Sequence, residues 1–422
     1  MKKLFAILTA MILLLVSSGA MAEQEPAPIT LEVCIVDTNW QDAWKTMKAN
    51  FESEYPWITL ESVGSDQNIT EFISTRIAAQ DLPAVIKLTV GDIYLDMIEA
   101  GMIKDLTGME CAANIPQSFL DAFTYDGILT GITQGASFST LYLNMDALEK
   151  AGWMQPPANW TEFLQCCADI QAKTDYAPLL INGDHHTICY MLYELMLANC
   201  FTTQEEARAY EDSLSNGTFD YAAYPEAAEK LKQVIPYMMT GCSTTTQDDA
   251  VAIMAEGGAA MLLSGNWVSA ATLDAIDANC GHEGAGIAIL PPFNNEGKDL
   301  WISRSTEVAF AITKQNDPAI EEAAELFMNW VFKPENFRII QNARGTVPVL
   351  TTMTEEQIVL PEGIKGLVEP VGITNFVMMG YNMYGAEFKD AAMTALRDAY
   401  SGNNTVEHAI KTMTDVAAKY HK

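Results

Sequence analysis

The stretch DDAVAIMAEGGAAMLLSGNWVS, residues 248–269, contains a complete helix-to-strand transition and then an aromatic side chain. Its first part predicts an amphipathic helix that ends at Gly257, because glycine tolerates the left-handed conformation of a helix C-terminus. The short apolar run at 259–263 predicts a buried strand. Trp267 stands just past that strand, at the edge where α/β proteins bind ligands. Its flat ring with one N–H group suits a sugar ring, and a tryptophan of the core is the alternative interpretation.

The rest of the chain repeats this alternation of strands and helices. Strands are predicted at 29–36, 57–63, 84–90, 285–290 and 308–313. Helices are predicted from about residue 41 to 55 and at 68–80, 92–101, 146–152, 318–332, 385–400 and 405–420. Strands that alternate with helices of this length indicate βαβ units and a parallel sheet, so the fold class is α/β.

The composition is that of a globular protein with a strongly acidic surface. The chain has 422 residues, a hydrophobic fraction of 49% and a formal net charge of −31. This length is enough for about two to three domains. The negative charge argues against nucleic acid and anionic membrane surfaces as partners, since both require a basic footprint.

The N-terminus has the pattern of a secretory signal peptide. Lys2 and Lys3 precede an apolar segment at 4–16, and Ala20-Met21-Ala22 forms a small-residue cleavage site. We expect residues 1–22 to be removed and the protein to be exported. No cysteine lies near this site, so no lipid anchor is expected there, and no later apolar segment is long enough to span a membrane.

The cysteines and histidines do not form a recognisable metal or redox motif. Export permits disulfides, but the eight cysteines include no C-x-x-C pair. Cys34 and the pair Cys166-Cys167 fall in a predicted strand and helix, where thiols commonly pack as apolar groups. The pair His185-His186 is interpreted as a loop rather than a metal site. We therefore expect no metal and no cofactor.

Several further segments, in order, resemble the family 1 extracellular solute-binding proteins, which capture sugars for ABC importers. These segments are Gln80–Val85 (QDLPAV), Ile98–Leu106 (IEAGMIKDL), Tyr125–Ile132 (YDGILTGI), Leu141–Asp146 (LYLNMD), Ala151–Phe163 (AGWMQPPANWTEF), Ala323–Trp330 and Gly345–Val349 (GTVPV). The quoted stretch 248–269 is similar to the family segment that ends in G-x-W. Some positions depart from the family pattern, such as Ala84 in place of an aspartate.

The resemblance implies a two-lobed, periplasmic-binding-protein-like fold of type II, with a ligand cleft between lobes that a multi-strand hinge joins. It places residues 23–135 and about 290–342 in one lobe, and about 140–285 and 347–422 in the other. Hinge crossings are expected at Thr133–Ser139, Leu290–Phe293 and Arg344–Val349. It further implies a monomeric carrier, periplasmic or extracellular, that delivers a carbohydrate to the permease subunits of an ABC transporter in the membrane.

Candidate ligand-binding residues lie where strands end or hinge crossings begin. In the first lobe, Asp37, Asn39, Trp40 and Asp92 follow strands, although the polar ones equally suit helix capping. Phe138 and Tyr142 flank the first crossing, with core packing as the alternative interpretation, and Asn266 stands beside Trp267, with turn formation as the alternative. Trp301 and Arg304 are expected in a polar loop, which could be an ordinary exposed loop. Tyr381 and Tyr384 are candidates from the second lobe. Arg304 could form paired hydrogen bonds to hydroxyl groups or a carboxylate.

Three classes of function are compatible with an exported, acidic, aromatic-rich chain. A secreted glycosidase would need two facing carboxylates, which sequence cannot exclude, but no known catalytic motif is present. A surface scaffold protein would show repeats or low complexity, and neither is found. The ordered motifs favour a binding protein without catalytic residues. The solute is expected to be a carbohydrate, an oligosaccharide in particular, with a non-sugar solute as the alternative.

Overall fold

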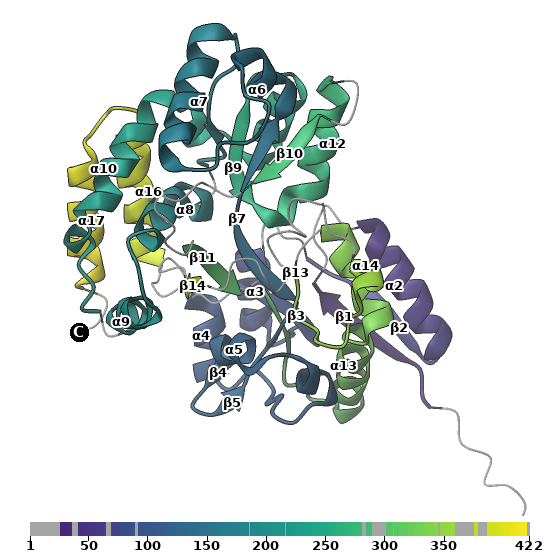
Figure 1. The fold of residues 1–422 in the computed structure, drawn as a ribbon. Helices are drawn as coiled ribbons and strands as arrows, with labels where there is room; N and C mark the ends of the chain where they lie inside the picture. The colour runs from purple at the N-terminus through teal and green to yellow at the C-terminus, as the bar shows by residue number, and fades with distance from the viewer. Residues whose placement is uncertain are drawn as a thin grey trace, which may run out of the picture.

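The protein consists of two α/β bodies, which Figure 1 shows one above the other with β7 running between them. The computed structural model describes residues 26–35, 41–64, 69–88, 92–184, 186–215, 217–280, 284–288, 301–306, 308–344, 347–358, 375–378 and 386–419. The predicted signal peptide, residues 1–22, lies outside the described residues.

The first sheet has the strand order β2-β1-β3-β12-β6. Strands β1 (Ile29–Cys34), β2 (Ile58–Ser62) and β3 (Val85–Leu88) are parallel, which confirms the βαβ prediction. Strand β12 (Ala309–Ile312) runs antiparallel to β3 and to β6 (Ile132–Thr133). The helices of this body are α2 (Gln41–Glu54), α3 (Ile69–Ala79), α4 (Asp92–Glu99), α5 (Gln117–Leu120), α13 (Pro318–Val331) and α14 (Pro334–Arg344), and a hairpin joins β4 (Thr124–Tyr125) to β5 (Ile128–Leu129).

A cluster of aromatic side chains lies at the centre of the first body, and we call the buried residues around it the first core. The ring of Phe51 on α2 meets Phe327 edge to face at 5.2 Å and Trp330 at 5.4 Å. The indole N–H of Trp330 donates to the Glu54 carboxylate at 2.8 Å. Such edge-to-face pairs add to the energy of area burial, so these rings fix α13 against α2.

The second sheet has the order β14-β11-β7-β9-β8, and β10 and β13 also pair with β7. Its strands are β7 (Gly135–Asn144), β8 (Leu180–Ile181), β9 (Met261–Gly265), β10 (Ala285–Ala288), β11 (Trp301–Thr306), β13 (Val347–Pro348) and β14 (Asn375–Met378). Its helices are α6 (Met145–Ala151), α7 (Trp160–Lys173), α8 (His186–Ala198), α9 (Gln204–Ser215), α10 (Pro225–Val234), α11 (Gln247–Ala255), α12 (Ser269–Cys280), α16 (Ala386–Tyr400) and α17 (Val406–Ala417).

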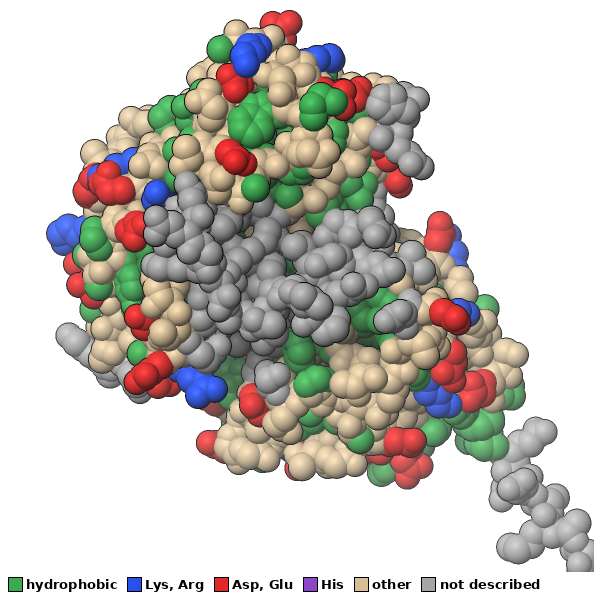
Figure 2. Space-filling model, in the orientation of Figure 1, with side chains coloured by type: hydrophobic (Ala, Val, Ile, Leu, Met, Phe, Trp, Pro, Cys, Tyr) green, Lys and Arg blue, Asp and Glu red, His purple; other side chains and the backbone are tan. Residues whose placement is uncertain are grey.

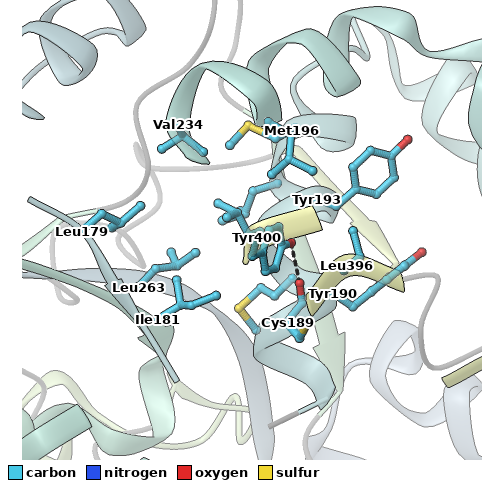
Figure 3. Packing of buried hydrophobic residues seen from close by; sticks show 14 of the residues in the cluster. Leu179, Ile181, Cys189, Tyr190, Tyr193, Met196, Val234, Leu263, Leu396 and Tyr400 are labelled. Carbon is cyan, nitrogen blue, oxygen red and sulfur yellow. Dashed lines mark hydrogen bonds between the residues drawn. The ribbon is translucent and has the colours of Figure 1, made fainter. Parts of the chain in front are cut away.

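One face of this sheet packs on helix α8, and α10 and α16 pack on α8 in turn. The second core is the cluster of buried residues of this body, and it includes side chains from both faces of the sheet. Figure 3 shows Ile181 of β8 and Leu263 of β9 pointing toward Cys189 and Tyr400. The hydroxyl of Tyr400 on α16 donates to the carbonyl of Cys189 on α8 at 2.7 Å. The first and second cores are separate clusters of buried side chains. Each body therefore has its own hydrophobic core.

The chain passes between the two sheets where short strands follow one another. Strand β6 belongs to the first sheet and β7 to the second, so one passage lies at Gln134, within the predicted crossing Thr133–Ser139. A second passage lies between Thr306 of β11 and Ala309 of β12. The predicted crossing at Leu290–Phe293 lies outside the described residues. At the third crossing, β13 pairs with β7 and Val349 then joins the first core.

The helix-to-strand transition at 248–269 has the local structure that its sequence predicts. Helix α11 begins after Thr246, whose hydroxyl oxygen accepts a hydrogen bond from the amide of Asp249 at 3.2 Å. Gly257 adopts a φ of 73°, which only glycine reaches without strain, and the chain then enters β9. The strand covers 261–265 and is buried throughout its length. The prediction of a buried strand is therefore confirmed, and the observed strand begins and ends two residues later than the predicted range 259–263.

All eight cysteines are free thiols, and six of them are buried. Burial raises the pKa of Cys34, Cys111, Cys166 and Cys189 to about 12, and that of Cys242 to about 11. A raised pKa keeps a thiol neutral at physiological pH, and the neutral thiol is a poor nucleophile. These five buried cysteines are therefore packing residues rather than reactive groups.

We expect these five thiols to resist iodoacetamide at pH 8 in the folded protein, because only roughly one thiol in ten thousand is ionised at a pKa of about 12, and roughly one in a thousand at the pKa of about 11 of Cys242. Peptide mapping after labelling measures each site. The half-buried Cys280 is an internal comparison. Denatured protein should label at every cysteine, and equal labelling of Cys34 and Cys280 in the folded state would contradict this assignment.

The surface carries more acidic than basic side chains, as the net charge of −31 requires. Figure 2 shows acidic groups spread over both bodies on the face in view, with basic groups between them. Within the part of the chain that the structure describes, no helix combines the length and apolar character needed to cross a bilayer.

Candidate functional site

Trp267 lies at the end of β9, in the short 3-10 helix η8 (Asn266–Val268). Its ring packs directly on Gly265, since a Cβ atom at that glycine would lie 2.0 Å from the ring. Its indole Nε1 donates to the side-chain oxygen of Gln247, the first residue of α11, at 3.2 Å. The side chain is half-buried. Two elements thus hold the indole in one orientation while part of its surface stays accessible.

Gly265→Ala tests this arrangement, because the added methyl group must displace the indole ring. We expect a shift in tryptophan fluorescence and at least a tenfold loss of affinity for the solute, about 1.4 kcal/mol. Gly286→Ala on β10 is the matched control, since its Cβ would meet the flexible Met145 side chain at 3.2 Å and the Leu143 Cβ at an ordinary contact distance of 3.4 Å. Unchanged fluorescence and affinity in Gly265→Ala would show that the ring does not depend on Gly265.

Asn266, Phe138 and Tyr142 join β7 to the end of β9. The amide oxygen of Asn266 accepts a hydrogen bond from the backbone N–H of Phe138 at 3.0 Å, and the Tyr142 hydroxyl donates to the carbonyl of Gly265 at 2.8 Å. Asn266 and Tyr142 are fully buried, and Phe138 is 4% exposed. These contacts hold the strand end that carries Trp267. Contact of Asn266 and Phe138 with a ligand stays a prediction.

Trp301 and Arg304 belong to strand β11, so the expectation of a polar loop at these residues is wrong. Arg304 pairs with Phe138 of β7 on one side and with Met378 of β14 on the other. The polar sequence WISRST forms a strand because two strands far away in the chain supply its hydrogen-bond partners. The pairing brings the backbone of β11 next to the strand that Asn266 contacts.

The remaining predicted site residues are placed only in part. Asp92 is the first residue of α4, four positions after Leu88, the last residue of β3. His186 opens α8, and among the described residues no group of three potential ligands could hold a metal ion. Five predicted residues lie outside the described residues, namely Asp37, Asn39, Trp40, Tyr381 and Tyr384.

Sequence analysis missed Gln247 and Gly265 as partners of the indole. Gln247 precedes the quoted stretch by one residue, and its side chain reaches a ring twenty positions further along the chain. A glutamine after the capping residue Thr246 gives no signal of such a contact. Gly265 stands just past the apolar run, and a glycine at that place signals a turn rather than a contact with a ring.

Two separately cored α/β bodies, joined by strands that pass from one sheet to the other, define the class of two-lobed solute-binding proteins. Solved structures of this class are similar along nearly the whole chain. A chitin oligosaccharide binding protein matches with a TM-score of 0.76 and 18% identity, covering 94% of this chain and 99% of that one. The GacH receptor of Streptomyces glaucescens, solved unliganded and with acarbose, matches with 0.76 and 16% identity, covering 94% and 100%. RafE in complex with raffinose matches with 0.74 and 17%, covering 93% and 100%.

The chain belongs to the bacterial extracellular solute-binding protein family, whose model matches residues 46–362. Binding proteins, rather than enzymes, make up this family and the similar structures. A protein of Brucella abortus (strain 2308) with a provisional binding-protein name is 35% identical over 138 residues, which is 31% of this chain. A Brucella suis biovar 1 (strain 1330) protein matches to the same extent. The match spans about a third, 32%, of the length of these curated relatives.

Proposed function

We propose that this protein is the exported solute-binding subunit of an ABC importer and that it captures a carbohydrate, an oligosaccharide in particular. Family membership supports a solute-binding role. The observation that carries the carbohydrate assignment is the geometry of Trp267. A half-buried indole, held on Gly265 and oriented by Gln247, presents a flat apolar surface to one apolar face of a sugar ring.

The similar structures support the same solute class. Their titles describe proteins that bind chitin oligosaccharide, acarbose and raffinose. At 16–18% identity they share the fold with this chain, and the side chains that contact the solute are its own. The oligosaccharide assignment therefore rests on Trp267 together with the predicted aromatic residues Trp40, Trp301, Tyr381 and Tyr384.

The mechanism follows from two bodies and a strand hinge. A solute that contacts both lobes stabilises the conformation in which the lobes are close, because it binds that conformation more tightly. The closed monomer would then dock on the permease subunits of the transporter, outside the cytoplasmic membrane. In this proposal one lobe comprises residues 23–135 and about 290–342, and the other about 140–285 and 347–422. Strand β11 departs from that division, because it pairs with β14 and β7 of the second sheet and so belongs to the second lobe.

A thermal-shift screen of the purified mature protein across mono- and oligosaccharides tests the proposal. A solute that binds only the folded state stabilises it by about 2.7 kcal/mol at a hundredfold excess over Kd. We expect a saturable rise in Tm with one or more oligosaccharides. A screen in which amino acids or peptides raise Tm, and no carbohydrate does, would overturn the carbohydrate assignment.

The same samples separate a binding protein from a secreted hydrolase. After incubation with a bound oligosaccharide, chromatography should recover the sugar at its original length and amount. Release of shorter sugars with turnover would contradict the binding-protein assignment, since catalysis needs a facing pair of carboxylates that a carrier does not.

A further inference from the structure

Asn182 follows β8 directly and is completely buried, with 0% of its surface exposed. Within the described part of the chain, neither its amide nitrogen nor its amide oxygen has a hydrogen-bond partner. Buried polar groups normally have hydrogen-bond partners, because a buried donor or acceptor without a partner destabilises the folded state by the free energy of its lost hydration. Both atoms of this side chain therefore require a partner that the described side chains do not supply.

Ser264 of β9 is the neighbour of Asn182 across the sheet. Strands β8 and β9 are parallel, with Leu180 opposite Leu262 and Ile181 opposite Leu263, so the next step along brings Asn182 opposite Ser264. Ser264 is 1% exposed, and its hydroxyl also has no partner among the described residues. Residues opposite each other share a face of the sheet, so three unmet polar atoms lie on one side.

This face is the opposite one from that which packs on Cys189 and Tyr400, and it also carries Leu180 and Leu262. Figure 3 shows Ile181 and Leu263 pointing toward Tyr400 and Cys189. Successive side chains of a strand alternate, so Asn182 and Ser264 point to the opposite side. The sheet thus separates the unmet atoms from Cys189 and Tyr400, whereas Tyr142 and Leu262 lie on the same face as Ser264.

The surroundings of Asn182 leave space only for something small. A Cβ at the next residue, Gly183, would lie 2.7 Å from the carbonyl oxygen of Cys242, so the segment at 242–244 packs tightly over this turn. The amide of Gly183 donates to that carbonyl at 3.0 Å, and Arg397 of α16 donates to the carbonyl of Gly183 at 2.9 Å. The turn is closed on both sides, and a sugar ring has no access to it.

We propose that Asn182 and Ser264 bind one buried water molecule, an inference that goes beyond the proposed function and does not depend on it. A water can donate to Asn182 Oδ1, accept from Asn182 Nδ2 and pair with Ser264 Oγ, which gives the roughly three hydrogen bonds usual for buried water. The bound water joins the carboxyl ends of β8 and β9. Ser264 lies three residues before Trp267, so the water helps to position the segment that carries the indole.

Ser264→Ala tests the water site through the sign of its effect on Tm, measured without any added solute. If the hydroxyl pairs with a bound water, its removal lowers Tm by about 2 °C. If no molecule is bound, the variant removes an unmet buried hydroxyl, and Tm stays constant or rises. Either of those two results would overturn the proposal.

Ser139→Ala is the matched control. Ser139 is 2% exposed with an unmet hydroxyl, and it lies on the neighbouring strand opposite Gly265, on the other face of the sheet. Its partner on β9 is Gly265, which has no polar side chain to share a water with it, so its removal should leave Tm unchanged or higher.

The double variant shows whether the two residues share one molecule. In an Asn182→Leu background the water is already lost, so Ser264→Ala should lower Tm by less than half of its effect in the wild type. Equal losses in both backgrounds would overturn a shared site. If a hydroxyl of the solute occupied this site instead of water, Ser264→Ala would leave the Tm of the solute-free protein unchanged and would reduce the rise in Tm that the solute produces. That pair of results would also overturn the water assignment.

Discussion

Replacing Trp267 by alanine is expected to abolish most of the rise in Tm that a bound oligosaccharide produces. A tryptophan at the centre of a binding site commonly contributes 2 kcal/mol or more, so the affinity should fall by about thirtyfold or more. The half-buried indole contacts Gly265 and Gln247, and part of its surface is accessible to a solute. Trp267 lies at the edge of the second core, so its replacement removes the surface for the solute and leaves the buried residues of that core in place. Isothermal titration of variant and wild type measures the change in Kd.

Trp153→Ala is the matched control for that experiment. Trp153 is also a half-buried tryptophan of the second body, and its indole N–H donates to the carboxylate of Asp169 at 3.0 Å. It lies beyond α6, away from the end of β9. Its removal should leave the solute-induced shift intact. A full shift in Trp267→Ala would place that residue in the core and contradict the site.

Trp330→Ala is expected to produce the largest loss of stability and to confine it to the first body. Trp330 is 1% exposed, stacks on Phe327 and donates its N–H to Glu54. Truncation of a buried aromatic residue to alanine costs about 3–5 kcal/mol. Because the two cores are separate clusters, calorimetry should show an unfolding transition of the first body at lower temperature while the transition of the second body keeps its Tm.

Trp330→Phe serves as the control, since it keeps an aromatic ring beside Phe51 and Phe327 and removes the hydrogen bond to Glu54. Its loss should be about 1–2 kcal/mol, the range for one buried hydrogen bond and a small change of volume. Equal displacement of both transitions by Trp330→Ala would contradict the independence of the two cores.

The local elements of this fold could be predicted from sequence because their signals are local. The helix end at Gly257 needs no distant partner, and the helices predicted at 41–55, 92–101 and 318–332 are observed within two residues of those bounds. Strand β11 could not be predicted in the same way. Its polar residues pair with Phe138 on one side and Met378 on the other, both remote in the chain, and tertiary pairing decided its structure.

The candidate site shows the same division. The position of Trp267 at a strand end follows from a glycine stop, a short apolar run and a turn, all within twenty residues. Its orientation depends on Gln247 and Gly265, and the burial of Asn266 depends on a hydrogen bond to Phe138 across 128 positions. Sequence patterns give the place of a side chain in its element, whereas its partners depend on how the elements pack.

The central claim is that the two bodies bind a carbohydrate at the end of β9 without changing it. Titration calorimetry of the mature protein with the oligosaccharide that gives the largest thermal shift, followed by chromatography of the recovered sugar, tests it most directly. We predict saturable binding at one site per chain and full recovery of intact sugar. Conversion of the sugar, or the absence of heat with every carbohydrate that the screen includes, would contradict the claim.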